Sequence, residues 1–363
     1  MRITVGIPAY KAYEHICDCL ASIQIQTMKK DISVIIASDN PEDDYEFVRD
    51  RFKDLEITIL PCEKNTGAGL ARQRCIDACK TDWITLIDAD DVFFTPFAIE
   101  SLIKGIQPQT IEVQGAFLQE IDDNPQGIRA VPRNDIGHPW VFGRLYNVKF
   151  LNQNGIAFTD LRAMEDGEFN WKINMTIEGS QFTKNIINEN IYLWRTGSEH
   201  SITRIGTDDD GIPQYNFDLC QIGATIASIR ASKFCKEKNP FNGGIDRFIT
   251  EMMVGHYFTY VTCLARKPIF AEQNLFNAKR FYHECYSEIE NRISTKILTD
   301  IYTMQRGQHS EDLLGIIPEI SFFDFMDKVR NDEYGGEDEL KSIRSKFPKE
   351  IIENDLKTGV ATF

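Results

Sequence analysis

Apolar runs alternate with amphipathic stretches over the first hundred residues of the chain. The apolar runs are rich in β-branched residues, and each ends in a polar or acidic turn; they comprise residues 2–8, 32–40, 55–61 and 83–88. Helical apolar spacing lies between them, most clearly in residues 13–27 and 66–80. Nearly continuous apolar strands separated by helices of about 10 to 15 residues predict a parallel sheet covered on both faces.

The pattern changes after residue 110. Residues 111–122 and 127–133 predict two strands joined by a turn. Residues 138–158 and 161–175 each predict a loop followed by a helix, and residues 189–204 predict a strand that runs into a polar loop. Beyond about residue 206 the spacing is mostly helical. We therefore expect an α/β domain over residues 1–205 and a helical region over residues 206–363, which packs on the first domain, binds a partner or binds the acceptor.

Composition narrows the classes of function. A formal net charge of -15 argues against non-specific binding to nucleic acid or anionic lipid, although it leaves room for a local basic groove. No window approaches the roughly 18 to 20 apolar residues of a membrane-spanning helix. The first ten residues are typical of a strand rather than a signal peptide. The nine cysteines are dispersed and form no CxxC pair, which indicates a reducing, cytoplasmic environment.

Carboxylates crowd the end of the fourth apolar run. Asp88, Asp90 and Asp91 follow it directly. In a parallel sheet, ligands bind beyond the carboxyl ends of the strands, so these side chains should meet residues 8–10 and 38–40 at one edge. Carboxylate oxygens suit Mg²⁺ or Mn²⁺, which commonly complete their coordination with phosphate oxygens. Taken alone, such a loop is a helix cap or a solvated turn in about half of its occurrences.

Several segments together resemble family 2 glycosyltransferases. They are "VGIPAY" (5–10), "SDN" (38–40), residues 65–91 with the "DADD" loop, residues 140–158, "MEDGEF" (164–169) and residues 192–204. The resemblance covers about residues 3–204. It implies an inverting enzyme that uses a nucleotide-activated sugar. It also implies the GT-A fold, a Rossmann-like α/β domain with a mostly parallel sheet flanked by helices, here followed by the helical C-terminal region.

The resemblance assigns roles on the donor side of the site. Pro8, Ala9 and Tyr10 would line the base and ribose, and Asp39 would accept a hydrogen bond from the base, normally uracil. The residues that would support the base, diphosphate or ribose are Gly67, Arg72 and Asp88. Asp90 would hold the Mn²⁺ or Mg²⁺ ion, with Asp91 as a competitor for that role. The lesser alternative for Arg72 is a surface ion pair with Asp77 or Asp82.

The resemblance also assigns the catalytic side. Asp166 matches the general base, with Glu165 beside it. Because Asp166 begins a predicted helix, we expect the helix dipole to lower its pKa and keep it ionised. The segment that would line the donor sugar and the acceptor contains Trp140, Gly143, Arg144 and Tyr146. The segment that would close over the diphosphate contains Arg195, His200 and Ser201, and His200 would be a further metal ligand.

This chain departs from the family pattern at three places. "SDNP" stands where "DDGS" is common, Lys11 where Asn is common, and Arg144 where Lys is common. An Arg in place of a Lys keeps the charge but offers a planar fork instead of a point charge. The first departure weakens the expected contact of Asp39 with the base.

Alternatives remain open at this level. The acceptor would be a bacterial surface glycan or the hydroxymethylated pyrimidine of phage DNA. Binding to DNA would need a basic groove, for which the candidates are Arg129, Arg133, Arg144, Lys149, Arg230, Lys233, Lys236 and Lys238. Other functions that fit parts of the pattern are a nucleotidyltransferase or related nucleotide-sugar enzyme, and a non-catalytic nucleotide-binding module. Glu165 and Asp166 also fit an ordinary acidic first turn of a helix.

Overall fold

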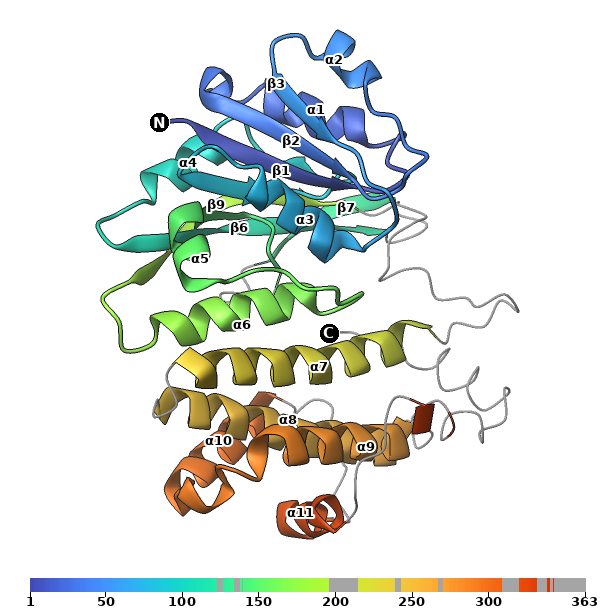
Figure 1. Ribbon diagram of the computed structural model, residues 1–363, viewed down its shortest axis with the longest axis vertical. Coiled ribbons are helices and arrows are strands. Elements are labelled where there is room, and N and C mark those ends of the chain that lie inside the picture. Colours follow the sequence, from blue (N-terminus) through green and yellow to red (C-terminus); the bar gives the residue numbers. More distant parts are fainter. Residues whose placement is uncertain are drawn as a thin grey trace. The chain divides into compact units, whose positions relative to one another are not determined.

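The computed structural model divides into two compact units, Met1–Ser201 and Ile202–Phe363 (Figure 1). The structure describes residues 1–122, 127–133, 138, 140–195, 215–238, 243–266, 270–308, 320–331, 338–339 and 342. Among these residues, none of the helices combines the length and the apolar character that crossing a membrane requires.

Four parallel strands form one half of the sheet in the N-terminal unit. They lie in the order β3-β2-β1-β4 and comprise β1 (Ile3–Ala9), β2 (Ile32–Ser38), β3 (Glu56–Leu60) and β4 (Trp83–Leu86). The register pairs Ala9 with Ser38 and Gly6 with Leu86. All residues of β1 are buried, as expected of a central strand covered on both faces. The parallel arrangement predicted from the apolar runs is confirmed.

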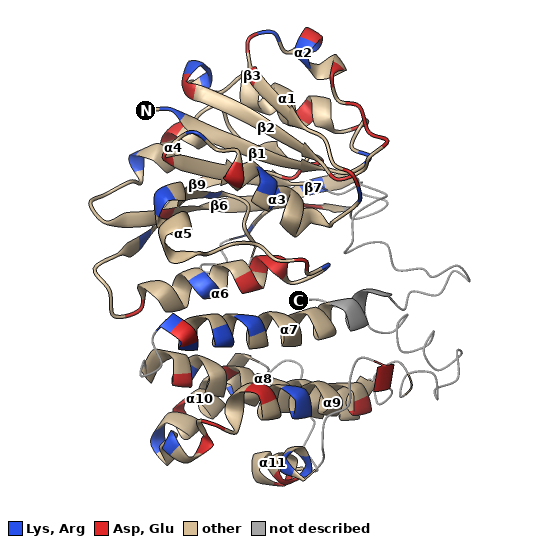
Figure 2. Ribbon diagram, in the orientation of Figure 1, with Lys and Arg blue, Asp and Glu red and all other residues tan. Residues whose placement is uncertain are grey.

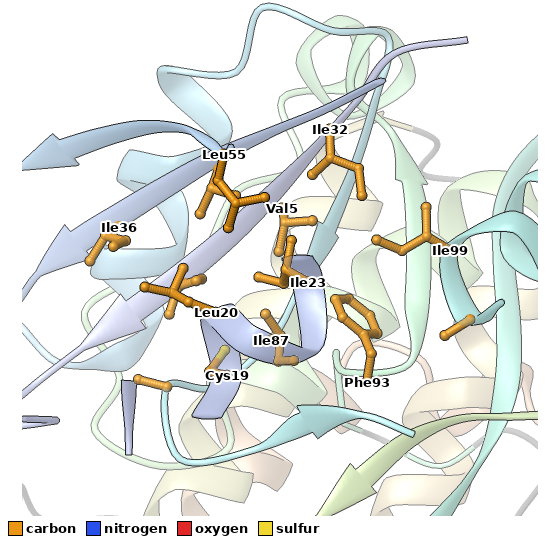
Figure 3. Close-up of a cluster of buried hydrophobic side chains, with 14 of the residues drawn as sticks. Val5, Cys19, Leu20, Ile23, Ile32, Ile36, Leu55, Ile87, Phe93 and Ile99 are labelled. Carbon is orange, nitrogen blue, oxygen red and sulfur yellow. The ribbon is translucent and has the colours of Figure 1, made fainter. Parts of the chain in front are cut away.

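Helices cover both faces of this half. One face carries α1 (Ile16–Gln24), α2 (Phe47–Arg51) and α4 (Ala98–Lys104), with the short η1 (Lys29–Asp31) after α1. Leu20 and Ile23 of α1 and Ile99 of α4 pack there with Val5 and Ile36 in a buried cluster (Figure 3). The other face carries α3 (Ala68–Asp77). A Cβ on Gly6 would lie 2.8 Å from the Cβ of Cys75, so a glycine is what lets α3 approach β1 this closely.

The second half of the sheet is mixed. Its strands are β5 (Val92–Phe93), β6 (Thr110–Asp122), β7 (Ile128–Arg133), β8 (Arg144–Asn147) and β9 (Thr183–Trp194). β8 joins the halves, because it pairs antiparallel with both β4 and β6. β6 and β7 form the predicted antiparallel pair, whose turn lies outside the described residues, and β9 runs parallel to β6. The α/β fold class is confirmed.

Two strands were not predicted, the two-residue β5 and β8. Residues 138–158 were expected to be a loop followed by a helix, but the structure places β8 directly before α5 (Val148–Asn154). β8 was missed because four residues are too few to show an alternation of apolar and polar positions. Asn147 ends this strand and caps α5, because its side chain accepts a hydrogen bond from Phe150 N. The predicted helix after residue 161 is α6 (Glu165–Ile177), which follows Met164 in the left-handed conformation, with φ of 64°. Figure 2 shows the acidic residues at the start of α6.

The C-terminal unit is helical where it is described. Its helices are α7 (Tyr215–Lys238), α8 (Gly243–Arg266), α9 (Ala271–Phe281), η3 (Tyr282–Tyr286), η4 (Glu290–Arg292), α10 (Thr295–Gln308) and α11 (Phe322–Arg330). Tyr257, Phe258, Phe322 and Phe325 are buried among them as an aromatic core. The prediction of a helical C-terminal region is confirmed.

Candidate active site

The polar residues that follow the parallel strands lie at one edge of the sheet. Asp39 N donates to Ala9 O at 2.7 Å, and Ile87 N donates to Gly6 O at 3.0 Å, so the ends of β1, β2 and β4 are held together. Pro8 and Ala9 are buried, whereas Tyr10 is exposed at the rim. The meeting of these three strand ends follows from their parallel order, as the sequence predicted.

Asp39 binds the protein's own backbone. Its Oδ1 accepts hydrogen bonds from Thr66 N and Oγ1, both at 2.8 Å, and its Oδ2 accepts one from Gly67 N at 2.7 Å. The residue is buried, and Gly67 has a φ of 91°, which only glycine adopts readily. Asp39 therefore fixes the turn that leads into α3. The predicted contact of Asp39 with the donor base remains a prediction.

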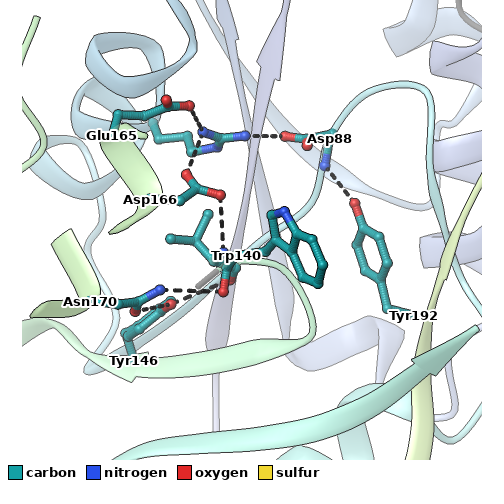
Figure 4. A network of polar contacts seen from close by, with 9 residues as sticks. Asp88, Trp140, Tyr146, Glu165, Asp166, Asn170 and Tyr192 are labelled. Carbon is teal, nitrogen blue, oxygen red and sulfur yellow. Dashed lines mark hydrogen bonds and ion pairs between the residues drawn. The ribbon is translucent and has the colours of Figure 1, made fainter. Parts of the chain in front are cut away.

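Arg72 is the centre of the site. Its Nη2 donates to Asp88 Oδ1 at 2.7 Å, and its Nη1 donates to Glu165 Oε1 and Asp166 Oδ1, each at 2.9 Å (Figure 4). The Arg72 side chain is only 7% exposed. One guanidinium group thus joins the loop after β4 to the first turn of α6.

This link was missed by the sequence analysis, which placed Arg72 on the donor side alone or on the surface. One signal for it was available. Arg72 stands beside Ala71 and in register with Cys75 and Ile76 on the buried face of α3. An arginine in that position must find acidic partners inside the protein.

Burial governs the titration of the two carboxylates on α6. It raises the pKa of Asp166 to about 7, while Arg72 lowers this pKa and Glu165 and Asp88 raise it further. Burial likewise raises the pKa of Glu165. The expectation that the helix dipole would lower the pKa of Asp166 is therefore corrected. The reason is that loss of hydration outweighs a dipole effect that falls off within one turn.

Asp91 belongs to the framework of the loop. Its Oδ2 accepts a hydrogen bond from the Tyr192 hydroxyl at 2.5 Å, and its Oδ1 accepts one from Arg195 N at 2.7 Å. Asp91 is 2% exposed, and burial raises its pKa well above the ordinary range, with Asp90 and Asp88 adding to the effect. Tyr192 also accepts a hydrogen bond from Asp88 N at 3.3 Å. These contacts argue against the predicted role of Asp91 as a metal ligand.

Asp88 and Asp90 are the half-buried carboxylates of the loop. Within the described residues, no group of three or more His, Cys, Asp or Glu side chains could hold a metal ion. Two carboxylates together with the phosphates of a donor nevertheless suit Mg²⁺ or Mn²⁺, which often take only one or two protein ligands. The residues present fit such an ion if Asp88 and Asp90 hold it with the donor.

The remaining predicted residues divide into three groups. Arg144 is buried between β4 and β6, where it forms an ion pair with Glu112 and donates to His138 O. Tyr146 is also fully buried, so neither side chain lines an open site as predicted. Arg195 pairs with Asp18 on α1, with Nη1 3.0 Å from Oδ2. His200 and Ser201 lie outside the described residues.

The fold has relatives among solved structures. Residues 1–349 of S. aureus TarS in complex with UDP-GlcNAc superpose with a TM-score of 0.60 and 14% sequence identity, covering 86% of this chain and 92% of that chain. The longer structure of S. aureus TarS gives a TM-score of 0.59, covering 86% of this chain and 54% of that chain. At this identity the likeness shows the fold, which is the GT-A fold of glycosyltransferases.

Sequence comparison gives the family. Residues 4–164 match glycosyl transferase family 2. The uncharacterized glycosyltransferase YwdF of Bacillus subtilis (strain 168) is 35% identical over 107 residues, 30% of this chain and 39% of the relative. The poly(ribitol-phosphate) beta-glucosyltransferase of Bacillus spizizenii is 24% identical over 221 residues, 55% of this chain and 33% of the relative. The match over residues 4–164 confirms the resemblance to family 2 glycosyltransferases seen in the sequence. The chain spans at most 39% of the length of these relatives.

Proposed function

We propose that the protein is an inverting glycosyltransferase that moves a sugar from a nucleoside diphosphate donor, first of all a UDP-sugar, to an acceptor hydroxyl. The observation that carries this proposal is the bridge formed by Arg72. Asp88, on the predicted donor side, and Asp166, the predicted base, both lie within hydrogen-bonding distance of one guanidinium group. A donor held at the end of β4 would therefore present its sugar close to Asp166.

Asp166 acts as the general base in this proposal. It accepts the proton of the acceptor hydroxyl while the acceptor oxygen forms a bond to the anomeric carbon. The bond from that carbon to the diphosphate oxygen breaks at the same time, and the electron pair leaves with the nucleoside diphosphate. A carboxylate with a pKa raised to about 7 suits this task, since a base works best when its pKa lies near the working pH. Glu165 shares Arg72 Nη1 with Asp166 and so helps to place the guanidinium group.

Charge on the leaving diphosphate needs compensation. A Mn²⁺ or Mg²⁺ ion bound by Asp88 and Asp90 would supply it as a Lewis acid. Among the residues that the structure describes, Arg195 is a candidate to contact the diphosphate with its positive charge. It stands directly after β9, and its backbone is tied to the loop through Asp91. Its present partner Asp18 is 60% exposed, and such a surface ion pair is weak enough to be exchanged.

The relatives favour a glycan as acceptor. One is named for transfer of glucose to poly(ribitol phosphate), and the TarS fragment was solved with UDP-GlcNAc. Modified DNA is the less favoured acceptor, because three of the residues proposed for its basic groove have other roles. Arg144 is buried, and Lys233 and Lys236 form ion pairs with Glu284 and Glu288. We assign acceptor or partner binding to the C-terminal unit and a cytoplasmic location to the protein as parts of the same proposal.

Turnover of a panel of nucleotide sugars tests the proposal. The protein is incubated with each sugar and Mn²⁺, with and without a poly(ribitol phosphate) acceptor, and the release of nucleoside diphosphate is followed. The donor that reacts is then tested with Asp166→Asn, which should abolish transfer and leave the Kd of the donor within about twofold. Asp50→Asn, a change at an exposed position on α2, is the matched control. Equal loss of transfer and donor binding in Asp166→Asn would remove Asp166 as the base.

A further inference from the structure

The two oxygens of Asp166 have different partners. Oδ1 accepts a hydrogen bond from Arg72, whereas Oδ2 accepts one from the backbone N–H of Val141 at 3.2 Å (Figure 4). The Arg72 guanidinium group is held by its other partners, Glu165 and Asp88. The N–H of Val141 belongs to the backbone peptide that joins Trp140 to Val141. The direction in which this N–H points depends on what holds that peptide.

Two buried side chains hold the peptide and its neighbour. Asn170 Nδ2 donates to Trp140 O at 3.3 Å. The Tyr146 hydroxyl lies 3.4 Å from Val141 O and 3.3 Å from Asn170 Oδ1, and its one proton is shared between these two acceptors. Trp140 O is the carbonyl of the same peptide whose N–H reaches Asp166. A hydrogen bond at that oxygen therefore sets the orientation of the whole peptide plane.

The sequence places these side chains where they can act on the base. Asn170 stands four residues after Asp166 on α6, so both side chains lie on one face of the helix. Tyr146 comes from β8, the strand that joins the two halves of the sheet, and its ring packs edge-on against Phe169 at 5.5 Å. Both residues are at least 97% buried, with exposures of 3% for Asn170 and 0% for Tyr146. Both side chains are therefore shielded from solvent.

We infer that Asn170 and Tyr146 are positioning residues for the base, which fix the Trp140–Val141 peptide so that its N–H holds Oδ2 of Asp166. The inference rests on the proposed role of Asp166. It also gives Tyr146 a function other than the lining of the site that the resemblance implied. With Oδ1 held by Arg72 and Oδ2 held by Val141, the carboxylate is fixed at both ends, and each oxygen keeps one lone pair for an acceptor hydroxyl.

The same contact affects the charge of the base. A hydrogen bond from Val141 N favours the ionised form of Asp166, as does Arg72, while burial and the carboxylates of Glu165 and Asp88 oppose ionisation. If the peptide turns away, the pKa of Asp166 rises and the carboxylate is free to rotate. Both changes reduce the rate of transfer, and neither alters the binding of the donor.

Two variants and a control test the inference. Tyr146→Phe removes one hydroxyl, Asn170→Leu removes the amide at similar volume, and Tyr257→Phe is the control. The last removes a buried hydroxyl that donates to a backbone carbonyl, Ile320 O at 3.1 Å, in the other unit. For each, we measure kcat and KM for the donor found above, the pH dependence of kcat/KM, and the thermal midpoint.

We expect kcat to fall about 3- to 10-fold in Tyr146→Phe and about 10- to 100-fold in Asn170→Leu, because a small displacement of a catalytic group greatly reduces the rate of reaction. KM for the donor stays within about twofold, and the acid-side midpoint of kcat/KM moves to higher pH in both. Tyr257→Phe changes neither kcat nor this midpoint. If Asn170→Leu does not fold, Tyr146→Phe alone decides, since it removes a single oxygen atom.

Failure of the inference differs from failure of the proposed function. If Asp166→Asn transfers sugar at the unaltered rate, the base assignment is wrong and the inference falls with it. If Asp166→Asn is inactive while Tyr146→Phe and Asn170→Leu lose only thermal stability, with normal kcat and an unmoved midpoint, only the positioning role is overturned.

Discussion

Arg72 Nη1 lies 2.9 Å from Oδ1 of Asp166. The same guanidinium group also contacts Glu165 and Asp88, so three carboxylates share one buried cation. When these carboxylates are ionised, the cluster carries an excess of negative charge, to which Asp90 and Asp91 add. Such an excess adds to the effect of burial in raising the pKa values of Glu165 and Asp166, and it favours the binding of a second cation. The relationship between Arg72 and Asp166 therefore connects the ionisation of the base to the charge at the donor side.

Replacing Arg72 should separate its charge from its geometry. Arg72→Lys keeps a cation but cannot form the planar fork that reaches both the β4 loop and α6. We expect kcat/KM to fall about 100-fold or more in Arg72→Lys. Arg72→Met leaves the buried carboxylates unpaired and should reduce the free energy of unfolding by about 3 to 5 kcal/mol. Donor turnover and urea unfolding measure the two effects.

The control for this pair is Arg247→Lys on α8. Arg247 is 47% exposed and forms an ion pair with Glu251 one turn away, which contributes little to stability. Arg247→Lys should leave both measurements unchanged. Normal kcat/KM in Arg72→Lys would show that only the positive charge matters.

Stability and activity should respond to pH in opposite directions because of Asp166. Its folded-state pKa of about 7 lies above the ordinary value of about 3.9 in an unfolded chain. The folded state therefore binds the proton more tightly. The stability that this gives is complete below about pH 4 and is lost as the pH rises through about 7. Transfer needs the carboxylate, so kcat/KM, which reports the free enzyme, should rise over the upper part of this range and level off above about pH 7.

Urea unfolding between pH 5 and 8, without donor or metal, measures the first effect. Burial also raises the pKa values of Glu165 and Asp91, which act in the same direction. Asp166→Asn should therefore reduce the slope of stability against pH without removing it. An unchanged slope would mean that Asp166 titrates at its ordinary pKa in the folded protein.

The parallel half of the fold could be predicted from the sequence for a simple reason. Buried strands such as residues 32–38 are nearly all apolar, and each is long enough for the pattern to be seen. β8 has four residues, and its Arg144 and Tyr146 look polar although both are buried. The sequence pattern alone predicts that such residues lie on the surface or in a functional site. It does not reveal that Glu112, which is distant in sequence, forms an ion pair with Arg144 inside the sheet.

Part of the candidate site could likewise be predicted from the sequence, and part could not. The carboxylates at the end of β4 were predictable, since the parallel order of the strands determines which loops share an edge. Which of these carboxylates faces inward was not predictable. Asp90 and Asp91 are neighbours of identical chemistry, and the contacts of Asp91 with Tyr192 and Arg195 distinguish them. Those contacts come from β9 and the residue directly after it, about one hundred residues later in the chain.

Asp90 and Asp91 should therefore give different phenotypes when each is changed to Asn. Asp90→Asn removes a proposed metal ligand and should raise the Mn²⁺ concentration for half-maximal turnover about tenfold or more. Asp91→Asn cannot accept both hydrogen bonds with its amide and should lower the free energy of unfolding by about 1 to 3 kcal/mol. Metal titration of turnover and thermal unfolding separate the two. A larger shift in metal requirement for Asp91→Asn than for Asp90→Asn would reverse the assignment.

Gly69 controls how closely α3 approaches the segment that carries the base. A Cβ at this position would lie 3.0 Å from Thr159 O and 3.1 Å from Glu165 Cγ, so we expect Gly69→Ala to push Thr159 and Glu165 away by a few tenths of an ångström. Since Arg72 is one turn further along α3, the displacement changes its distance to Glu165 and Asp166. We expect kcat to fall about tenfold or more, although alanine favours a helix by up to about 1 kcal/mol.

The matched control is Gly307→Ala in α10, where a Cβ meets no atom within 4 Å. That change should stabilise the protein by about 0.4 to 1 kcal/mol and leave kcat unaltered. Normal kcat in Gly69→Ala would show that the contacts of Arg72 tolerate a shift of α6.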